Sequence, residues 1–344
     1  MKTALATLMT LALAGTALAQ SVIYSNAGSP SDTGLAPSSA TLSGVAAPAG
    51  LLWSEASALG SGPTRTEASA VAGFAGYAVG SGHYRFADDF VIPPTTGGWR
   101  IDGATLYAYI VGTPGSPAFT SATLRIWRSS PADVGSTLAF GDDTTNRLQS
   151  SALTNIRRVF STASVTGAPA AIAPDTSRPI YQIALALPSV TLTPGTYWLD
   201  WQLIAAADAP SFTPPITIPG QRAKGGANAL HLRLAPPPDL VDQWLPLIDM
   251  GKPASAPDAA QDLPFLLSGA VLPAPCGQSD VAGANQSVGP DGALTADDII
   301  VFLGWYFAAD TRADVAGANQ STTPDSAFTA DDIIVFLGRY FSGC

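Results

Sequence analysis

The chain has 344 residues, a formal net charge of −10, and 33 glycines and 29 prolines. Lysine and arginine together number only 16, so the basic stripe by which a protein binds nucleic acid is missing, and we expect no nucleic acid partner. This composition favours turns and short strands over long helices.

The first 19 residues are predicted to be a secretory signal peptide. Lys2 supplies the positive start, an apolar run continues through Leu13, and Ala17-Leu18-Ala19 offers a small-residue cleavage site. No later stretch approaches the roughly 18 apolar residues of a membrane helix. We therefore expect a secreted or cell-surface protein without membrane insertion.

Residues 20–272 are predicted to form a mostly β domain. Short β-favouring runs alternate with Gly, Pro, Ser and Thr clusters, and Leu106, Ala108 and Ile110 alternate with more polar neighbours, as in strands with two different faces. Many short strands need two sheets to share one core, which predicts a jelly-roll-like β-sandwich. Strands are expected at 21–24, 85–92, 99–111, 122–128, 156–160, 179–187, 196–203, 228–234 and 263–271, with long surface loops at 27–50 and 54–82.

This domain shows no convincing catalytic constellation. The chain has only two histidines, His83 and His231, and no motif of nucleophilic or zinc catalysis. A glycosidase would need paired carboxylates. Adjacent strand residues point to opposite faces, so turn and capping roles are favoured for the available ones. These carboxylates are Asp88, Asp89, Asp142, Asp143 and Asp200.

Aromatic residues offer a second possibility, a platform on which sugar rings stack, with core packing as the alternative. Strand aromatics pack in a core more often than they form a platform. If Trp198 faces the core, the strand period turns Trp201 to the other side, and this is the one sign in the sequence of an exposed sugar-binding face. Carbohydrate is therefore a further expected partner class. The aromatic candidates are Trp53, Tyr107, Tyr109, Trp127, Tyr197, Trp198, Trp201 and Trp244.

The most informative feature is a duplication at the C-terminus. The 28 residues from Asp280 recur from Asp314, 34 positions later, with 23 identities. Each copy is an aspartate-rich loop followed by an apolar helix, which is typical of calcium-binding loop-helix segments. The stiff connector Pro273-Ala274-Pro275 predicts a boundary, so residues 273–344 are expected to form a separate module.

The two cysteines, Cys276 and Cys344, bracket the duplication. In an exported protein such a pair favours a disulfide that closes the module end to end. The alternative is a free C-terminal thiol that links the chain to another molecule.

The loops are predicted to bind calcium at two sites. With Asp298 as position 12 of an EF-hand-like loop, Asp291 falls at position 5, while the oxygen ligand of position 3 is lost. An insertion of seven residues lets Asp280 return as the first ligand, with Asn285 nearby. The predicted ligands are Asp280, Asn285, Asp291, Ala293, Thr295 and Asp298 in the first copy, and Asp314, Asn319, Asp325, Ala327, Thr329 and Asp332 in the second.

Helix capping is the alternative interpretation of part of this pattern. Thr295 followed by Asp298, and Thr329 followed by Asp332, nearly form capping boxes without any ion. Both helices are apolar on nearly every side and must bury more than one face, which predicts docking to a partner. The docking candidates are Ile299, Ile300, Phe302, Leu303, Tyr306, Phe307, Ile333, Ile334, Phe336, Leu337, Tyr340 and Phe341.

These residues resemble dockerin domains, the duplicated calcium modules that attach secreted proteins to cohesin-type receptors. The resemblance lies in D-V-x-G at Asp280 and Asp314, in the D-G or D-S step at Asp291 and Asp325, and in the T-A-D-D-I-I segments. With the final Gly343-Cys344, the chain resembles GC-type dockerin domain-anchored exported proteins. The resemblance covers about 70 residues and implies calcium as cofactor and a cohesin-like or other surface protein as partner.

We therefore expect a non-enzymatic exported protein that is docked through a calcium-dependent module. The rival hypothesis is a glycan-binding or glycan-degrading component of an extracellular assembly.

Overall fold

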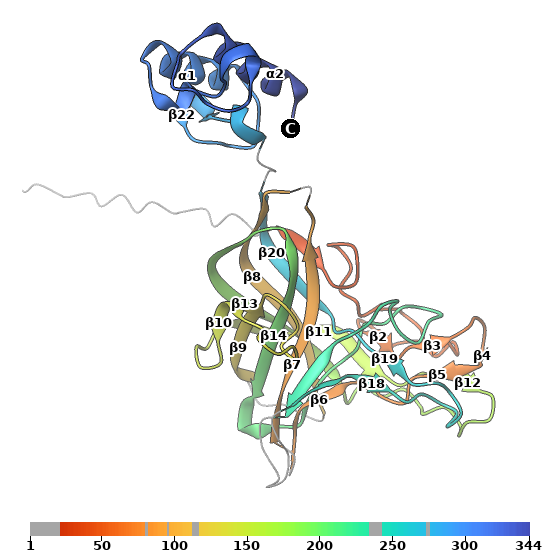
Figure 1. Ribbon diagram of the computed structural model, residues 1–344. Helices are drawn as coiled ribbons and strands as arrows, with labels where there is room; N and C mark the ends of the chain where they lie inside the picture. The colour runs from red at the N-terminus through yellow and green to blue at the C-terminus, as the bar shows by residue number, and fades with distance from the viewer. Residues whose placement is uncertain (1–20, 80–81, 95, 112–116, 234–242, 273–275) are drawn as a thin grey trace, which may run out of the picture.

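The computed structural model describes residues 21–79, 82–94, 96–111, 117–233, 243–272 and 276–344. The predicted signal peptide and the 273–275 connector lie outside these residues. The predicted mostly β class is confirmed: one mixed sheet has 14 strands, and two helices follow near the C-terminus (Figure 1). In the described parts the sheet does not close into a barrel, and no helix there has the length and apolarity to cross a membrane.

The large sheet is almost entirely antiparallel, and only β2 and β11 run parallel. Its main path is β10-β9-β14-β7-β6-β15-β8-β13-β11-β2. Off this path, β1 pairs with β20, β20 with β8, β16 with β7, and β17 with β16. The strand bounds are β1 Val22–Ser25, β2 Leu52–Glu55, β6 Phe74–Ala78, β7 Gly82–Ile92, β8 Gly98–Ile110, β9 Phe119–Trp127, β10 Leu138–Asp142, β11 Leu148–Val159, β13 Pro179–Leu192, β14 Gly195–Ala205, β15 Ser211–Thr213, β16 Leu230–Arg233, β17 Trp244–Pro246 and β20 Phe265–Leu272.

The remaining strands form small two-stranded sheets. Those of the first 272 residues gather on one side of the long strands in Figure 1. Their bounds are β3 Ala58–Leu59, β4 Thr64–Arg65, β5 Glu67–Ala68, β12 Ser164–Val165, β18 Ile248–Asp249 and β19 Ala259–Ala260, with β21 Ala282–Gly283 and β22 Ser287–Val288 in the C-terminal module.

The predicted alternation in β8 is found, and both of its faces are covered. Leu106, Ala108 and Ile110 belong to the main core cluster, whereas Tyr107 and Tyr109 lie in a second cluster. The main core also receives alternate side chains of β14, including Leu199 and Trp201. Apolar residues on both faces explain why this central strand carries so few charges.

All nine predicted strands exist with shifted ends, except that Leu234 lies outside the described residues. The predicted 54–82 loop is wrong in part, because β3, β4, β5 and β6 fall in it. Three of these strands have only two residues and the fourth has five, so they lack the periodic signal. The 27–50 segment forms no named strand, but it is not purely a surface loop, because Leu35 is fully buried.

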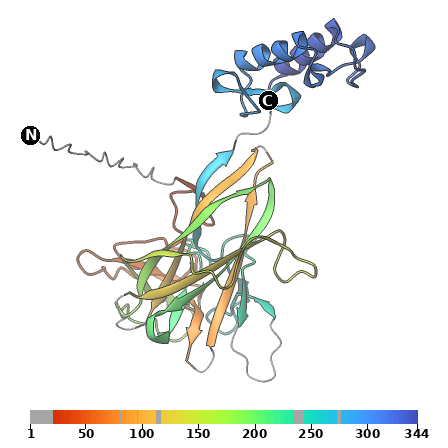
Figure 2. The same cartoon turned by 90° about the vertical axis from the view of Figure 1, so that its left-hand side faces the viewer.

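The C-terminal module is built on helices α1 (Ala296–Phe307) and α2 (Ala330–Ser342). Figure 2 shows the helical ribbon of this module at the blue, C-terminal end of the chain. The helices pack against one another, and the aromatic rings of Phe302 and Phe336 stack between them. Short 3-10 turns, Gly277–Ser279 and Thr311–Ala313, precede Asp280 and Asp314. The second copy therefore repeats the structure of the first as well as its sequence.

Candidate functional site

Both helices of the module begin at a capping box. Thr295 is the residue before α1, and its hydroxyl accepts the N–H of Asp297 at 3.2 Å. In return, the Asp298 carboxylate accepts the N–H of Thr295 at 2.7 Å. Thr329 and Asp332 form the same box at α2. The capping interpretation of these four residues is thus confirmed.

Asp298 also accepts hydrogen bonds from outside its capping box. It is fully buried, and its Oδ1 accepts the backbone N–H groups of Val281 and Ala282 at 2.8 and 2.9 Å. With the bond from Thr295, three N–H groups point at this one carboxylate. In the second copy, buried Asp332 receives the N–H groups of Val315, Ala316 and Thr329 at 2.9, 3.0 and 2.8 Å.

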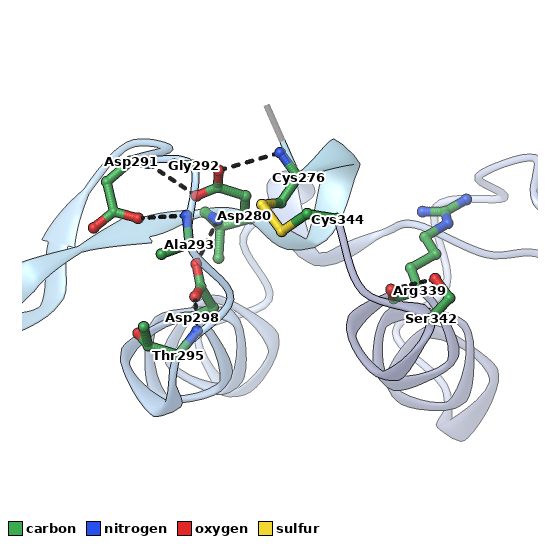
Figure 3. The surroundings of a disulfide bond; sticks show 11 residues. Cys276, Asp280, Asp291, Gly292, Ala293, Thr295, Asp298, Arg339, Ser342 and Cys344 are labelled. Carbon is green, nitrogen blue, oxygen red and sulfur yellow. Dashed lines mark hydrogen bonds between the residues drawn. A yellow bond between two sulfur atoms is a disulfide. The ribbon is translucent and has the colours of Figure 1, made fainter. Parts of the chain in front are cut away.

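Asp280 contacts the far end of its loop across the insertion, and its predicted role as the first calcium ligand stays a prediction. Its carboxylate accepts the N–H of Asp291 at 2.9 Å and of Gly292 at 2.8 Å (Figure 3). Asp314 makes the equivalent bonds to Asp325 and Ser326, at 3.2 and 2.8 Å. These aspartates therefore fix the two ends of each loop against one another.

The inserted residues fold as a tight hairpin between β21 and β22. At its tip Asn285 and Gln286 have positive φ angles of 60° and 57°, and Asn319 and Gln320 in the second copy have 61° and 60°. Asparagine tolerates this left-handed conformation better than most residues. The conformation gives both asparagines a role in the turn.

The remaining predicted ligands lie at the surface. Asp291 is exposed, and its Oδ1 accepts the N–H of Ala293 at 3.0 Å. Asp325 and Ala327 repeat this turn. Residues 276–344 are described throughout, and they contain no group of three or more acidic, histidine or cysteine side chains that could hold a metal ion.

These donor sets do not fit an EF-hand-like calcium site. Calcium takes six to eight oxygen ligands, and the position-12 acid offers both of its oxygens to the ion. Here both oxygens of Asp298 face backbone N–H groups. Calcium binding stays a prediction from the sequence, and no part of the function proposed below depends on it.

The predicted disulfide is present. Cys276 and Cys344 are bonded and join the start of the module to its last residue (Figure 3). The bond closes a loop with a sequence separation of 68 residues, and a loop of this length stabilises by roughly 4 kcal/mol in the chain-entropy model.

The structure divides the predicted docking residues into two groups. Phe302 and Phe336 are fully buried, and their neighbours pack partly buried against them. Those neighbours include Ile299, Leu303, Tyr306, Ile333, Leu337 and Tyr340. The exposed residues are Ile300 at 47%, Phe307 at 80%, Ile334 at 47% and Phe341 at 77%.

The four exposed residues form an equivalent stripe on each helix. Ile300 and Phe307 are seven positions apart, which places them on one helix face. Gly304 lies between them, and a side chain added there would meet nothing within 4 Å. Ile334, Gly338 and Phe341 repeat this arrangement, with the same open space at the glycine. We call these triplets the α1 stripe and the α2 stripe.

The candidate carboxylates of the β domain are occupied by structural partners. Buried Asp88 accepts hydrogen bonds from Asn26 and from the N–H of Leu263, both at 2.7 Å. Its burial and the neighbouring Asp262 carboxylate raise its pKa well above the usual range. Asp89 is half-buried on the other strand face. The sequence expectation that adjacent aspartates would not share a cleft agrees with this placement.

Asp200 lies at the centre of a buried charge cluster. Its Oδ1 accepts from Arg85 Nε at 2.7 Å, and its Oδ2 accepts from Arg125 Nε at 2.6 Å and from Trp127 Nε1 at 2.9 Å. Arg125 also lies 3.8 Å from Asp143. Asp142 accepts the N–H groups of the following turn, which lowers its pKa.

The expectation that Trp198 or Trp201 would be exposed is wrong, because both are buried. They do lie in separate clusters, as the strand period requires: Trp201 is in the main core, and Trp198 packs with half-buried Trp127 and Trp244. The other buried aromatic candidates are Trp53, Tyr107, Tyr109 and Tyr197. His83 lies 3.6 Å from Asp208, and His231 stacks on Tyr84.

Sequence reasoning missed a cavity of about 410 Å³ in the β domain. Its wall includes Trp53, Glu55, Thr217 and Ile218. The Glu55 carboxylate is held by the N–H groups of Leu42 and Thr162. Because the lining comes from strands and loops far apart in the sequence, no local motif could have shown it.

Comparison with known proteins returns no match: no family model, no curated protein and no solved structure is similar to this chain. The functional conclusions below therefore rest on the residues and the geometry.

Proposed function

We propose that the C-terminal module docks an exported β domain to a surface protein through the α1 and α2 stripes. The observation that carries this proposal is the repetition of the exposed stripe. Ile300 and Phe307 match Ile334 and Phe341 in position and nearly in exposure. Exposed apolar groups that recur at equivalent positions of both helices of a small charged module indicate an interaction surface, since isolated ones would be ordinary.

The charge of the module supports a particular kind of partner. Residues 276–344 contain nine aspartates and two arginines, a net charge of −7. Two such modules repel one another, whereas a partner with basic residues around an apolar surface is attracted. A cohesin-like or other surface protein of that chemistry is the proposed receptor.

The glycine in each stripe supports close contact with the partner. Glycine inside a helix is about 1 kcal/mol less favourable than alanine. Because a side chain at Gly304 or Gly338 would meet nothing within the module, the fold itself gives no reason for glycine. A partner backbone that packs into the space between Ile300 and Phe307 supplies one.

A capture experiment with matched variants of the full chain tests this proposal. The wild type and a Phe307→Asp/Phe341→Asp variant are used to recover proteins from the secreted and envelope fractions of the producing cells. Val288→Asp is the control, because Val288 is a 64% exposed apolar residue of the same module outside both stripes.

We expect the wild type and Val288→Asp to recover the same protein, which the double variant does not recover. Equal recovery by all three chains would contradict docking through the stripes.

For the β domain we propose a non-enzymatic role within a jelly-roll-like sandwich. Side chains of β8, β13 and β20 share the main core with those of β7, β9 and β14, which supports two packed layers.

Carbohydrate binding is the second candidate function, because Trp127 and Trp244 remain half-buried beside Trp198. Quenching of tryptophan fluorescence by soluble polysaccharides, lost in a Trp127→Ala/Trp244→Ala variant, would support it, and unchanged quenching in that variant would exclude this face.

A further inference from the structure

The resemblance to dockerins predicts that calcium organises each loop of the module. In the structure, hydrogen bonds from the loop backbone hold each loop in its conformation. In each copy two aspartates, Asp280 with Asp298 and Asp314 with Asp332, collect the N–H groups of residues far along the loop. We propose that these hydrogen bonds take the place of a bound ion, so that the module folds without a divalent cation.

The direction of the bonds is the first argument. An N–H group presents the positive end of its dipole to the carboxylate, which is where a cation would otherwise lie. At Asp298 the two oxygens together receive three such groups, all within 2.9 Å. Each carboxylate oxygen has two lone pairs, and both of those on Oδ1 are already used. An ion bound by both oxygens of this residue would have to displace at least one of these N–H groups.

The burial of these residues is the second argument. Asp298 and Asp332 are fully buried, whereas Asp291 and Asp325 are exposed and hydrogen-bonded within their own turns. In each copy the acid of position 12 is thus buried, while the acid of position 5 is at the surface. Neither set approaches the six to eight oxygens that calcium takes.

The duplication is the third argument. The two copies differ at five of 28 positions, including the glycine of position 6, which is Gly292 in one and Ser326 in the other. An EF-hand needs glycine at that position for its sharp turn. Ser326 adopts a positive φ of 65° and still donates to Asp314 at 2.8 Å. The hydrogen-bond pattern is therefore kept where the calcium-loop pattern is not.

The test compares thermal unfolding of the full chain in excess calcium chloride and in excess EDTA. We expect the same midpoint for the module in both solutions and no saturable heat in a calorimetric titration with calcium. A midpoint that rises with calcium and falls back with EDTA would overturn the proposal.

Two single substitutions at neighbouring residues in the first turn of α1 provide a matched comparison. Asp298→Asn removes an acceptor from the three N–H groups, whereas Asp297→Asn removes the same charge from the adjacent residue and leaves those bonds intact. We expect Asp298→Asn to lower the midpoint equally with calcium and with EDTA, and Asp297→Asn to leave it almost unchanged. Destabilisation by Asp298→Asn in calcium alone would mean that Asp298 binds the ion.

Amide hydrogen exchange keeps the test decisive if Asp298→Asn fails to fold. In the wild type, the N–H groups of Val281, Ala282 and Thr295 should be equally protected with calcium and with EDTA. Loss of their protection in EDTA would overturn the proposal. These readouts report folding only, so they are independent of the capture experiment that tests docking.

Discussion

Phe302 and Phe336 hold equivalent positions in the two copies of the duplication, and their rings stack on one another with centroids 3.8 Å apart and planes inclined by 7°. Each copy thus completes the core of the other. A single loop-helix unit would leave its phenylalanine without the stacked ring of the other copy, which gives a physical reason for the duplication.

Truncation of Phe302 should therefore destabilise the module strongly. Phe302→Ala leaves a cavity opposite Phe336, and such changes cost about 3–5 kcal/mol. Phe307→Ala, on the same helix but 80% exposed, should change the free energy of unfolding by less than about 0.5 kcal/mol. Denaturant unfolding followed by helical circular dichroism measures both. Similar losses in the two variants would mean that the ring stack contributes little.

The disulfide should be the second main source of stability in the module. Replacing both Cys276 and Cys344 by alanine removes the covalent closure, and we expect a loss of about 4 kcal/mol in the free energy of unfolding. A reducing agent should have the same effect on the wild type and no effect on the double variant. A module that unfolds at the same denaturant concentration with and without the bond would contradict this.

The sequence predicted the organisation of the module better than its surface. The duplicated apolar run identified the helices, and the Thr-x-x-Asp spacing identified their caps, because both signals are local. It could not separate buried Phe302 from exposed Phe307, since the helix is apolar on nearly every side and only the sister helix decides which face is covered.

Long-range hydrogen bonds explain the other limits of prediction. Counting loop positions back from Asp298 placed Asp280 at the start of the loop, but the N–H groups that meet Asp298 depend on the folded insertion. In the β domain, the long strands carried a periodic signal, whereas β3 and β5 pair over only two residues each. Strand register likewise decides that Asp200 is the carboxylate that pairs with Arg85 and Arg125, and the sequence alone does not give the register.

Asp200 should be essential to the stability of the β domain. It neutralises Arg85 and Arg125 in a buried cluster, and removing one partner of a buried ion pair costs about 3–5 kcal/mol because the other charges stay uncompensated. We expect this loss for Asp200→Asn in urea unfolding. Asp143→Asn removes the exposed partner of Arg125 and should cost less than about 1 kcal/mol. Equal effects would place the important contact at Asp143.

Asp88 and Asp142 should affect the pH dependence of stability with opposite signs. Burial and then Asp262 raise the pKa of Asp88, so folding takes up a proton there. Its contribution to the free energy of unfolding should fall as the pH rises above the ordinary aspartate range. Hydrogen bonds from Thr145 and Thr144 lower the pKa of Asp142, so its contribution is present above that range and is lost in acid.

Urea unfolding between acidic and neutral pH measures this difference. Asp88→Asn should lose stability relative to the wild type mainly at acidic pH, where the wild-type carboxyl is protonated and favourable. Asp142→Asn should lose it mainly at neutral pH. Parallel pH curves for the two variants would contradict the assignment.

The stripe glycines give a prediction in which stability and binding change in opposite directions. Gly304→Ala and Gly338→Ala replace an exposed helix-interior glycine where the added methyl group has open space. Each should stabilise the free module by about 1 kcal/mol because alanine is the better helix former. Each should also weaken capture of the docking partner, because the methyl group fills the space into which the partner backbone packs.

Thermal unfolding and quantitative capture by the same protein samples provide the two readouts. Ala308→Gly, at the exposed residue that ends α1, controls for flexibility near the stripe. Stabilised variants that capture the partner as well as the wild type would show that the glycines have no role at the interface.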